Sequence, residues 1–345
     1  MSATPKWTRR QVIKAGLVVG TGAFLTKEGV HAWVHRELPW DPAKEAGFSS
    51  QVFVGSASNY SVNLSGILLQ GFHELGVKKE ELLGKTILLK PNLVEPQRTE
   101  EHINTHPLMV RAAIEAFLHL GAAEVLVAEG SGHRRDSADV LEASGLGEVL
   151  REDRITYTDL NYETGYRALN LGACTGLATL TLPELFKRVD WIVSMPKLKT
   201  HHWAGVTLSM KNLFGVLPGI YYGWPKNVLH YVGVQNSILD LTATVKPHFS
   251  IVDGIVGMEG DGPIMGTAKD AGVVVMGRNP VSVDATAARL MMIDPAKVSY
   301  LKRASGWLGP IGLERIEQRG ENPASVGREF QLVEKFDAMR GIRLK

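Results

Sequence analysis

The 345-residue sequence predicts an α/β protein with a largely parallel sheet, helices on both faces of that sheet and Rossmann-like layering. Short apolar runs typical of buried strands alternate along the chain with segments of helical spacing, a pattern typical of parallel sheets covered on both faces. Polar motifs directly follow several of these apolar runs. Ligands of such sheets bind beyond the carboxyl ends of the strands, so we expect the polar loops to gather at that edge.

The elements are expected in the following order. An apolar run at 52–54 precedes helical spacing at 62–75, and KTILLKPNLV (85–94) indicates a buried strand that ends at Pro91. Pro107 suits the first position of a helix that continues to about residue 120. The remaining expected strands are 124–128, 154–158, 191–195, 250–252 and 272–276, and the remaining expected helices are 137–150, 206–213, 280–292 and 296–305.

The N-terminus predicts an export signal. TRRQVIKAG contains the pair Arg9-Arg10, and an uncharged apolar run follows at 15–25, the layout of a twin-arginine signal. That run is shorter than the ~20 residues that span a bilayer, and the alternative is an ordinary amphipathic helix with two chance arginines. We expect a signal peptide at 1–32, read by the Tat translocase, and a periplasmic or other extracytoplasmic location.

After the signal peptide we expect a linker at 33–50, containing Pro39 and Pro42, and a single α/β domain at 51–345 with no transmembrane helix. Residues 1–32 hold five of the 38 basic and one of the 36 acidic side chains, so the remainder carries 33 basic and 35 acidic residues, net −2. This balance argues against nucleic-acid binding. Cys174 is the only cysteine, so no intramolecular disulfide can form. One cysteine also cannot supply the ligand set of an iron–sulfur cluster.

The segment between Asp190 and Asp240 runs for 49 residues without an acidic side chain, although it contains four lysines. Cations without local counter-charges need carboxylates from distant segments or a bound anion. Glycine, asparagine and apolar residues interleave with these lysines, whereas a solvated face normally mixes charges of both signs. We therefore expect this segment to face a small anionic ligand.

The sharpest cluster in this segment is Lys197, Lys199, Thr200 and His201, which we expect in the loop that follows the strand at 191–195. Lysine binds anions as a point charge or acts as a base when its pKa is depressed, and histidine serves as a base or a metal ligand. We expect Lys199 and His201 to be catalytic. The remaining expected ligand-binding residues of the segment are Lys197, Thr200, Lys211 and Asn212.

Two earlier strand ends carry further candidates. Lys90 and Asn92 close a buried strand, where they are either packed polar groups or ligand-facing ones. Glu129-Gly130-Ser131-Gly132 resembles a strand-to-helix turn that presents backbone N–H groups to anions, although it lacks the full dinucleotide or P-loop fingerprint. We expect Glu129 and Ser131, together with Lys90 and Asn92, to bind the ligand.

His106 is a third expected catalytic residue because it stands at the start of the helix opened by Pro107. His102 lies four residues earlier, and that spacing would suit a metal only within one helix. Carboxylates in DGIVGMEGDGP suit a hard cation or balance the lysines, and Asp253 and Glu259 are the expected ligands of a divalent metal. Asp284 lies near the first turns of a helix, where it is either a carboxylate favoured by the helix dipole or a functional one.

These motifs together resemble the uncharacterised family called domain of unknown function 362. The resemblance rests on LLKPNLV, NTHPLMVRAAIEAFLHLGA, SMPKLKTHHWAGVTLSMKNLFG, DGIVGMEGDGP and SVDATAARLMMIDPAKV. The family resemblance implies redox or metal-linked chemistry, since other members are often joined to ferredoxin-like modules. This chain departs from that pattern with its single cysteine, so any electron donor would be a separate protein.

Three functions remain open from the sequence. The first is an exported enzyme that acts on an anionic small molecule, a carboxylate or phosphate, in a cleft lined by Lys and His, with or without a metal. The second is a periplasmic binding protein for an anion or metal complex. The third is a partner or maturation factor of an exported redox enzyme, since the apolar loop 217–224 supplies either an interface or a lid.

Overall fold

The computed structural model describes residues 50–132, 135–223 and 226–345. The expected signal peptide at 1–32 and all of the expected linker at 33–50 except Ser50 lie outside the described residues. In these residues the chain forms a main sheet of ten strands and a separate sheet of two.

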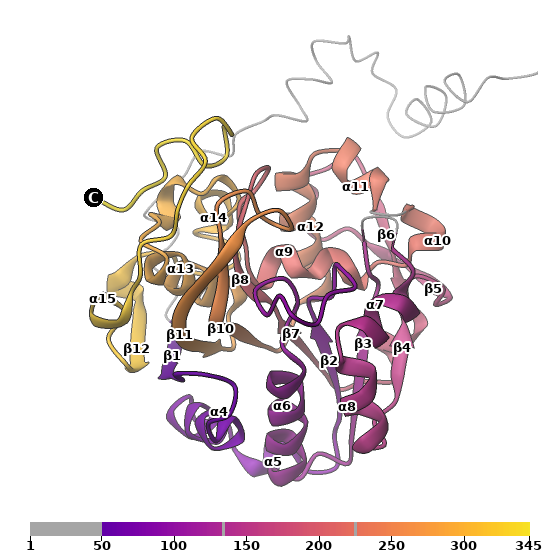
Figure 1. The fold of residues 1–345 in the computed structure, drawn as a ribbon. Helices are drawn as coiled ribbons and strands as arrows, with labels where there is room; N and C mark the ends of the chain where they lie inside the picture. Colours follow the sequence, from indigo (N-terminus) through magenta and orange to yellow (C-terminus); the bar gives the residue numbers. More distant parts are fainter. Residues whose placement is uncertain (1–49, 133–134, 224–225) are drawn as a thin grey trace, which may run out of the picture. The chain divides into compact units, whose positions relative to one another are not determined.

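A mostly parallel sheet of ten strands organises the fold (Figure 1). Eight strands follow one another in the order β12-β1-β11-β10-β7-β2-β3-β4, and β8 extends from β10 and pairs with β9. Only β11 runs against its neighbours on that eight-strand path, and β9 runs against β8. The strands are β1 Ser50–Ser56, β2 Thr86–Pro91, β3 Glu124–Glu129, β4 Tyr157–Asp159, β7 Trp191–Met195, β8 Lys197–His201, β9 Gly205–Thr207, β10 Phe249–Glu259, β11 Thr267–Gly277 and β12 Ile316–Gly320.

Helices cover both faces of this sheet, as predicted. In β2, Leu88 belongs to one apolar core, while Ile87 and Leu89 belong to the other, because successive strand residues point to opposite faces. The first core packs under α9 Ser209–Asn212, α12 Val234–Val245, α13 Pro280–Leu290 and α14 Ser299–Ala304. The second packs under α4 Leu64–Glu74, α6 Pro107–His119, α7 Ser137–Ala143 and α8 Leu146–Glu152.

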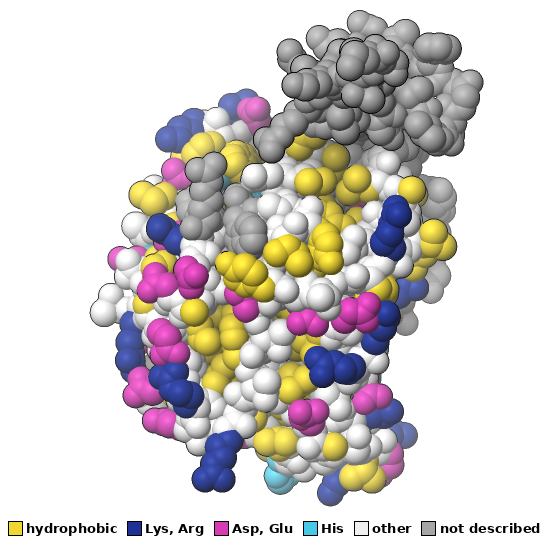
Figure 2. Space-filling view, turned by 90° about the vertical axis from the view of Figure 1, so that its right-hand side faces the viewer, with side chains coloured by type: hydrophobic (Ala, Val, Ile, Leu, Met, Phe, Trp, Pro, Cys, Tyr) yellow, Lys and Arg dark blue, Asp and Glu magenta, His cyan; other side chains and the backbone are white. Residues whose placement is uncertain are grey.

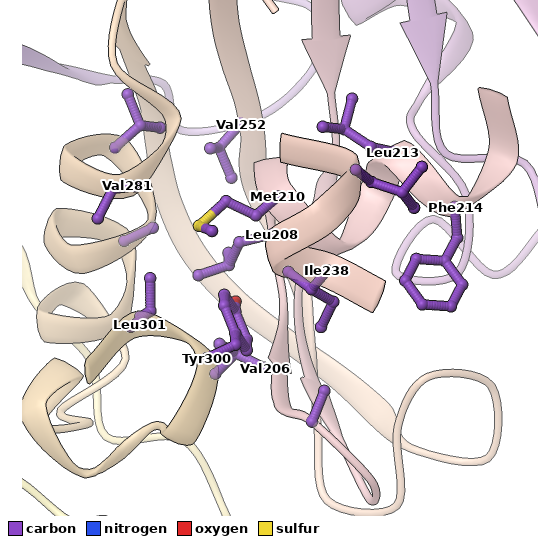
Figure 3. Close-up of a cluster of buried hydrophobic side chains, with 14 of the residues drawn as sticks. Val206, Leu208, Met210, Leu213, Phe214, Ile238, Val252, Val281, Tyr300 and Leu301 are labelled. Atoms are coloured by element: carbon purple, nitrogen blue, oxygen red, sulfur yellow. The ribbon is translucent and has the colours of Figure 1, made fainter. Parts of the chain in front are cut away.

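The short helix α9 is fixed by the first core. Leu208 and Met210 are fully buried, and Figure 3 shows them between Val281 of α13 and Ile238 of α12. Burying one such side chain contributes roughly 1.5–3 kcal/mol. This packing matters for the site because α9 also carries Lys211 and Asn212.

Some segments differ from the sequence expectation. The expected helix at 137–150 is divided into α7 and α8 at Gly145, whose φ of 81° interrupts the helix. The expected helix at 206–213 begins instead as strand β9, and only Ser209–Asn212 is α-helical before the 3-10 turn η2, Leu213–Val216. Lys197–His201 forms strand β8 rather than a loop, because it pairs with β10 on one side and β9 on the other.

The remaining elements lie outside the main sheet or at its edges. β5 Gly165–Leu169 and β6 Thr179–Pro183 form a separate antiparallel pair. The further helices are α5 Lys79–Leu82, α10 Gly219–Tyr222, α11 Asn227–Tyr231 and α15 Pro323–Val326, and the further 3-10 turns are η1 Glu184–Lys187, η3 Pro295–Lys297 and η4 Leu313–Arg315.

On the face drawn in Figure 2, acidic and basic side chains are interspersed across the described surface. Across the described ranges, every helix is too short or too polar to cross a membrane.

Candidate functional site

A cavity of about 660 Å³ lies at the carboxyl edge of β2 and β3, within the size range of small-molecule sites. Its walls come from the segments that follow β2, β3, β8 and β10 and from α9 and η2. Four lysines but only two carboxylates line it among the described residues. The titratable lining residues are Lys90, Glu129, Lys199, His201, His202, Lys211, Lys226, His230 and Asp261.

The floor of the cavity is a buried ion pair between Lys90 of β2 and Glu129 of β3. Lys90 Nζ also donates to Asn212 Oδ1 at 2.7 Å and to the Pro91 carbonyl at 2.9 Å. All three hydrogens of its ammonium are therefore used. Burial raises the pKa of the Glu129 carboxyl, and the neighbouring Lys90 opposes that rise. Gly215 allows this packing, because a Cβ there would stand 1.7 Å from Glu129 Oε1.

Asn212 ties this floor to the neighbouring strand. Its amide nitrogen donates to the Lys90 carbonyl and to Ser194 Oγ, both at 3.1 Å. The start of α9 is capped by Asp284 of α13, which accepts from the backbone N–H groups of Ser209 at 2.7 Å and Met210 at 3.0 Å. Burial raises the pKa of Asp284 to about 7. Asp284 thus orients helix α9. The dipole of its own helix α13 is therefore not the whole reason for a carboxylate at this position.

Lys199 lies in the cavity wall without a carboxylate partner among the described residues. Its side chain is fully buried, and Nζ donates to the carbonyls of Ile103 at 2.7 Å and Pro263 at 3.3 Å. Burial, and then the nearby Lys197, Lys211 and Lys90, hold its pKa well below the ordinary value. These two acceptors leave one position of the Lys199 nitrogen without a partner in the described chain.

Lys211 is the second amine of the wall that has no carboxylate partner in the described chain. Its Nζ stands 3.8 Å from the centre of the Phe214 ring, a cation–π contact. Burial, together with the nearby Lys90, lowers its pKa to about 7. Lys226 contacts Asn161 Oδ1, and burial lowers its pKa to about 8 against the opposing charge of Glu129.

Three histidines line the same cavity. His201 Nδ1 accepts a hydrogen bond from the backbone N–H of Trp203 at 3.0 Å. This contact assigns the proton of the neutral ring to Nε2. Burial and the nearby Lys211 hold the pKa of His201 well below its ordinary value, so the ring is neutral at pH 7. His202 Nδ1 lies 3.3 Å from Asp261 Oδ1, and His230 Nδ1 lies 3.1 Å from the Lys226 carbonyl.

Apart from Glu129 Oε2, which pairs with Lys90, two buried polar groups of the lining have an atom without a hydrogen-bond partner in the described chain. They are Asn92 Oδ1 and Thr207 Oγ1, and both residues are over nine-tenths buried. A buried polar atom left unpaired costs roughly 1–3 kcal/mol. A polar ligand in the cavity would remove that penalty.

A separate buried network surrounds Lys197. Its Nζ pairs with Asp253 Oδ2 at 2.7 Å and donates to the Tyr60 hydroxyl at 2.8 Å. Tyr60 in turn donates to Asp253 Oδ1 at 2.9 Å. His106 is the N-cap of α6, stacks on Tyr60 with ring centres 3.7 Å apart, and donates its backbone N–H to Asp253. Burial lowers the pKa of His106 to about 4.

Neither Lys197, His106 nor Asp253 lines the cavity. The same holds for Thr200, whose hydroxyl donates to the Gly260 carbonyl at 2.8 Å, and for Ser131, which is fully buried. The structure thus divides the expected site. It brings together Lys90, Asn92, Glu129, Lys199, His201, Lys211 and Asn212, and it places the other expected residues elsewhere.

Asp253 and Glu259, the expected metal ligands, have separate partners. Asp253 is held by Lys197 and Tyr60, whereas Glu259 accepts the Gln331 N–H at 2.9 Å and pairs with Lys269 at 3.3 Å. Among residues 50–132, 135–223 and 226–345, no group of three or more His, Cys, Asp and Glu side chains is placed to hold a metal ion. The two carboxylates therefore do not form a joint site.

The structure adds lining residues that the sequence reasoning did not single out. Among them are Lys226, His230, Trp203 and Thr207, which belong to the acid-free segment, and Met265, which does not. The long stretch without acids was a usable signal for the region of the first four. It does not single out Thr207, because a threonine at the end of a short strand is ordinary in sequence.

The chain belongs to the family described as domain of unknown function (DUF362), whose match covers residues 87–289. That match contains β2, β3, β7, β8 and α9, and hence most of the cavity. The chain is also similar to the thylakoid-associated protein sll1697 of Synechocystis sp. (strain ATCC 27184 / PCC 6803 / Kazusa), at 25% identity over 259 residues, or 72% of each chain.

Among solved structures, the chain is similar to the lactate racemase apoprotein from Thermoanaerobacterium thermosaccharolyticum. The TM-score is 0.38 and the identity 12%, over 64% of this chain. The aligned part spans about half of that protein, 52% of its length.

Proposed function

We propose that this chain is an enzyme that acts on an anionic small molecule, a carboxylate or a phosphate, bound in the cavity. One observation carries the proposal. Lys199 and Lys211 line the cavity and lack carboxylate partners in the described chain, whereas Lys90 and Lys197 have them. An amine kept from water and from counter-charges raises the free energy of the ligand-free protein, and an anion would offset that cost.

The four lysine and histidine groups have different roles in this proposal. Lys211, with a pKa of about 7, gains a proton when an anion binds and then holds that anion. Lys199, whose pKa is held down by burial, accepts a proton from the substrate, while the Nε2–H of the neutral His201 ring donates a hydrogen bond to the substrate. Lys90 contributes positive potential but no direct bond, because its three hydrogens are already used.

The proposal is tested by incubating the purified protein with a defined mixture of carboxylate and phosphate metabolites and following each by mass spectrometry. Wild-type protein is expected to deplete at least one anion and to form a product. Lys199→Met, which removes the proposed base, and His201→Leu, which removes the Nε2–H donor, are each expected to lose this turnover by at least about a hundredfold, the typical contribution of a general base or of one hydrogen-bond donor to the transition state.

Two other outcomes are informative. An anion that binds to both wild type and variants and is recovered unchanged would replace the enzyme with a binding protein. Absence of both binding and turnover would leave the partner-protein hypothesis, which the exposed apolar residues Ile220, Tyr221 and Tyr231 of α10 and α11 favour.

We also propose that the chain is exported through the twin-arginine pathway, on the basis of Arg9-Arg10 and the apolar run that follows. Fusion of residues 1–50 to a reporter that is active only after export tests this directly. Export is expected for the natural pair and is expected to be lost in an Arg9→Lys/Arg10→Lys variant. Equal reporter activity from both would refute the proposal.

A further inference from the structure

The residues that line the cavity differ sharply in exposure, and this difference distinguishes its deep part from its mouth. Lys199 of the wall and Lys90 and Glu129 of the floor are 0%, 1% and 2% exposed, so they lie deep in the cavity. Trp203 and Met265 are 58% and 78% exposed, so they stand at the mouth. The deep part is charged, and Trp203 and Met265 give the mouth a large apolar surface beside the partly exposed Asp261.

The apolar part of the lining comes from several separate segments. Leu93 and Val94 follow β2, Trp203 lies between β8 and β9, and Ile264 and Met265 lie between β10 and β11. These same connections bring the polar groups into the cavity. Separate stretches of the chain thus supply apolar surface around the charged floor.

Trp203 is held in place although its side chain is exposed. Its backbone N–H donates to His201 Nδ1, and its backbone carbonyl accepts from Gln235 Nε2 at 2.9 Å. Its ring packs edge-on against His202 and His230. A fixed and solvated tryptophan provides a large apolar surface that loses little side-chain entropy on binding. Met265 adds an unbranched side chain that adapts to the shape of a ligand.

From this arrangement we infer that the ligand is an amphipathic anion. The inference rests on the proposed function and refines it. A carboxylate or phosphate group contacts Lys199 and Lys211 of the cavity wall, and an alkyl or aromatic body of several carbons lies against Trp203 and Met265 at the mouth. A volume of about 660 Å³ accommodates such a molecule, and small polar anions such as acetate fill only the deep part.

The test is calorimetric titration of the protein with straight-chain carboxylates from acetate to octanoate, and in parallel with inorganic phosphate and its alkyl monoesters. Each added methylene is expected to lower Kd by about fourfold until the chain leaves the cavity. The two series together identify the head group. In a Trp203→Ala/Met265→Ala variant, the dependence on chain length, measured relative to the variant's own affinity for the shortest anion, is expected to fall by at least half.

Leu169→Ala is the matched control, because Leu169 is 72% exposed but lies on β5, away from the cavity. It is expected to keep the full dependence on chain length. If acetate and octanoate bind equally well, the inference is wrong although the proposed function stands. An unchanged dependence in the double variant also overturns the inference, because the alkyl chain then binds elsewhere. If neither series binds, the proposed function falls as well.

Discussion

Lys197 and Lys199 stand two residues apart on β8, and both are fully buried, yet they have opposite environments. Lys197 forms an ion pair with Asp253 and contacts the Tyr60 hydroxyl. Lys199 has two carbonyl oxygens and no carboxylate in the described chain. The first arrangement is complete without a ligand. The second leaves a reactive amine in a cavity wall, and this difference separates a structural lysine from a candidate functional one.

The comparison shows why residue type and burial do not by themselves identify a functional residue. A buried ion pair offsets its loss of hydration through Coulomb attraction and hydrogen bonds. An unpaired buried amine has no such compensation and responds by a lower pKa. Removal of each lysine should therefore have different consequences for stability and for binding.

The largest expected effect is on stability. Lys197→Met leaves the buried Asp253 carboxylate without its cationic partner. We expect the free energy of unfolding to fall by about 3–5 kcal/mol. Lys199→Met removes an amine that has no carboxylate partner in the described chain and leaves two carbonyl oxygens without their donor, so we expect a smaller loss of about 1–3 kcal/mol. Denaturant unfolding measures both. Equal losses would show that Lys199 is structural too.

An exposed ion pair provides the control for this experiment. Arg98 and Glu148 pair at 2.7 Å with both side chains at least half exposed. Because solvent screens such pairs, Glu148→Ala is expected to change stability by less than about 1 kcal/mol.

The second effect is on anion affinity. Lys211→Met removes a charged donor, worth about 1.5–3 kcal/mol when it is hydrogen-bonded, so we expect hexanoate affinity to fall about 10- to 100-fold. Calorimetry with hexanoate measures this directly. Lys302→Met, at an exposed position on α14, is the control and should bind like wild type. Undiminished affinity in Lys211→Met would remove Lys211 from the binding site.

A smaller loss of stability is expected when the Lys197 network is trimmed but not broken. Tyr60→Phe removes one hydroxyl that donates to Asp253 and accepts from Lys197, while the ion pair remains. We expect a loss of about 1–2 kcal/mol. A loss as large as that of Lys197→Met would mean that the hydroxyl, rather than the ion pair, holds the network together.

The smallest expected effect is a dependence of affinity on pH. The Lys211 ammonium is the form that attracts an anion, and its pKa is about 7. Hexanoate affinity should therefore be highest near pH 6 and decline by up to about tenfold as the pH rises to 8. Hexanoate itself stays ionised over this interval, because carboxyl groups titrate near pH ~4, well below it.

Lys211→Arg provides the test of this assignment, because arginine stays charged over the whole interval. That variant should keep only the weaker decline near pH 8 that Lys226 produces. A full decline in the arginine variant would assign the titration to another group.

Much of the fold could be predicted from the sequence. Apolar runs such as those of β2, β3 and β7 identify buried strands wherever they occur, because a parallel sheet needs apolar side chains on both faces. Because these strands alternate with helical segments, they are expected to run parallel and to end at the same edge of the sheet. Lys90, Glu129 and Lys199 stand at or just beyond strand ends, so they are expected near one another. These predictions depend on local patterns, which the tertiary structure did not override.

Other predictions were wrong because they depended on partners far away in the sequence. Lys197–His201 was expected as a loop, but β10 and β9 supply hydrogen bonds on both sides and make it a strand. Asp284 resembles an acid at the start of its own helix, but it caps α9, 74 to 75 residues away. Neither result has a local signal.

The sequence by itself therefore determined the class of fold, the edge of the sheet that carries polar groups and the excess of cations there. Only the tertiary structure decided which cation meets which acid. It paired Lys197 with Asp253 and Lys90 with Glu129 and left Lys199 and Lys211 without acidic partners in the described chain. The physical reason is that charge balance within a folded protein acts through space, over a few ångströms, between residues that the chain separates by tens of positions.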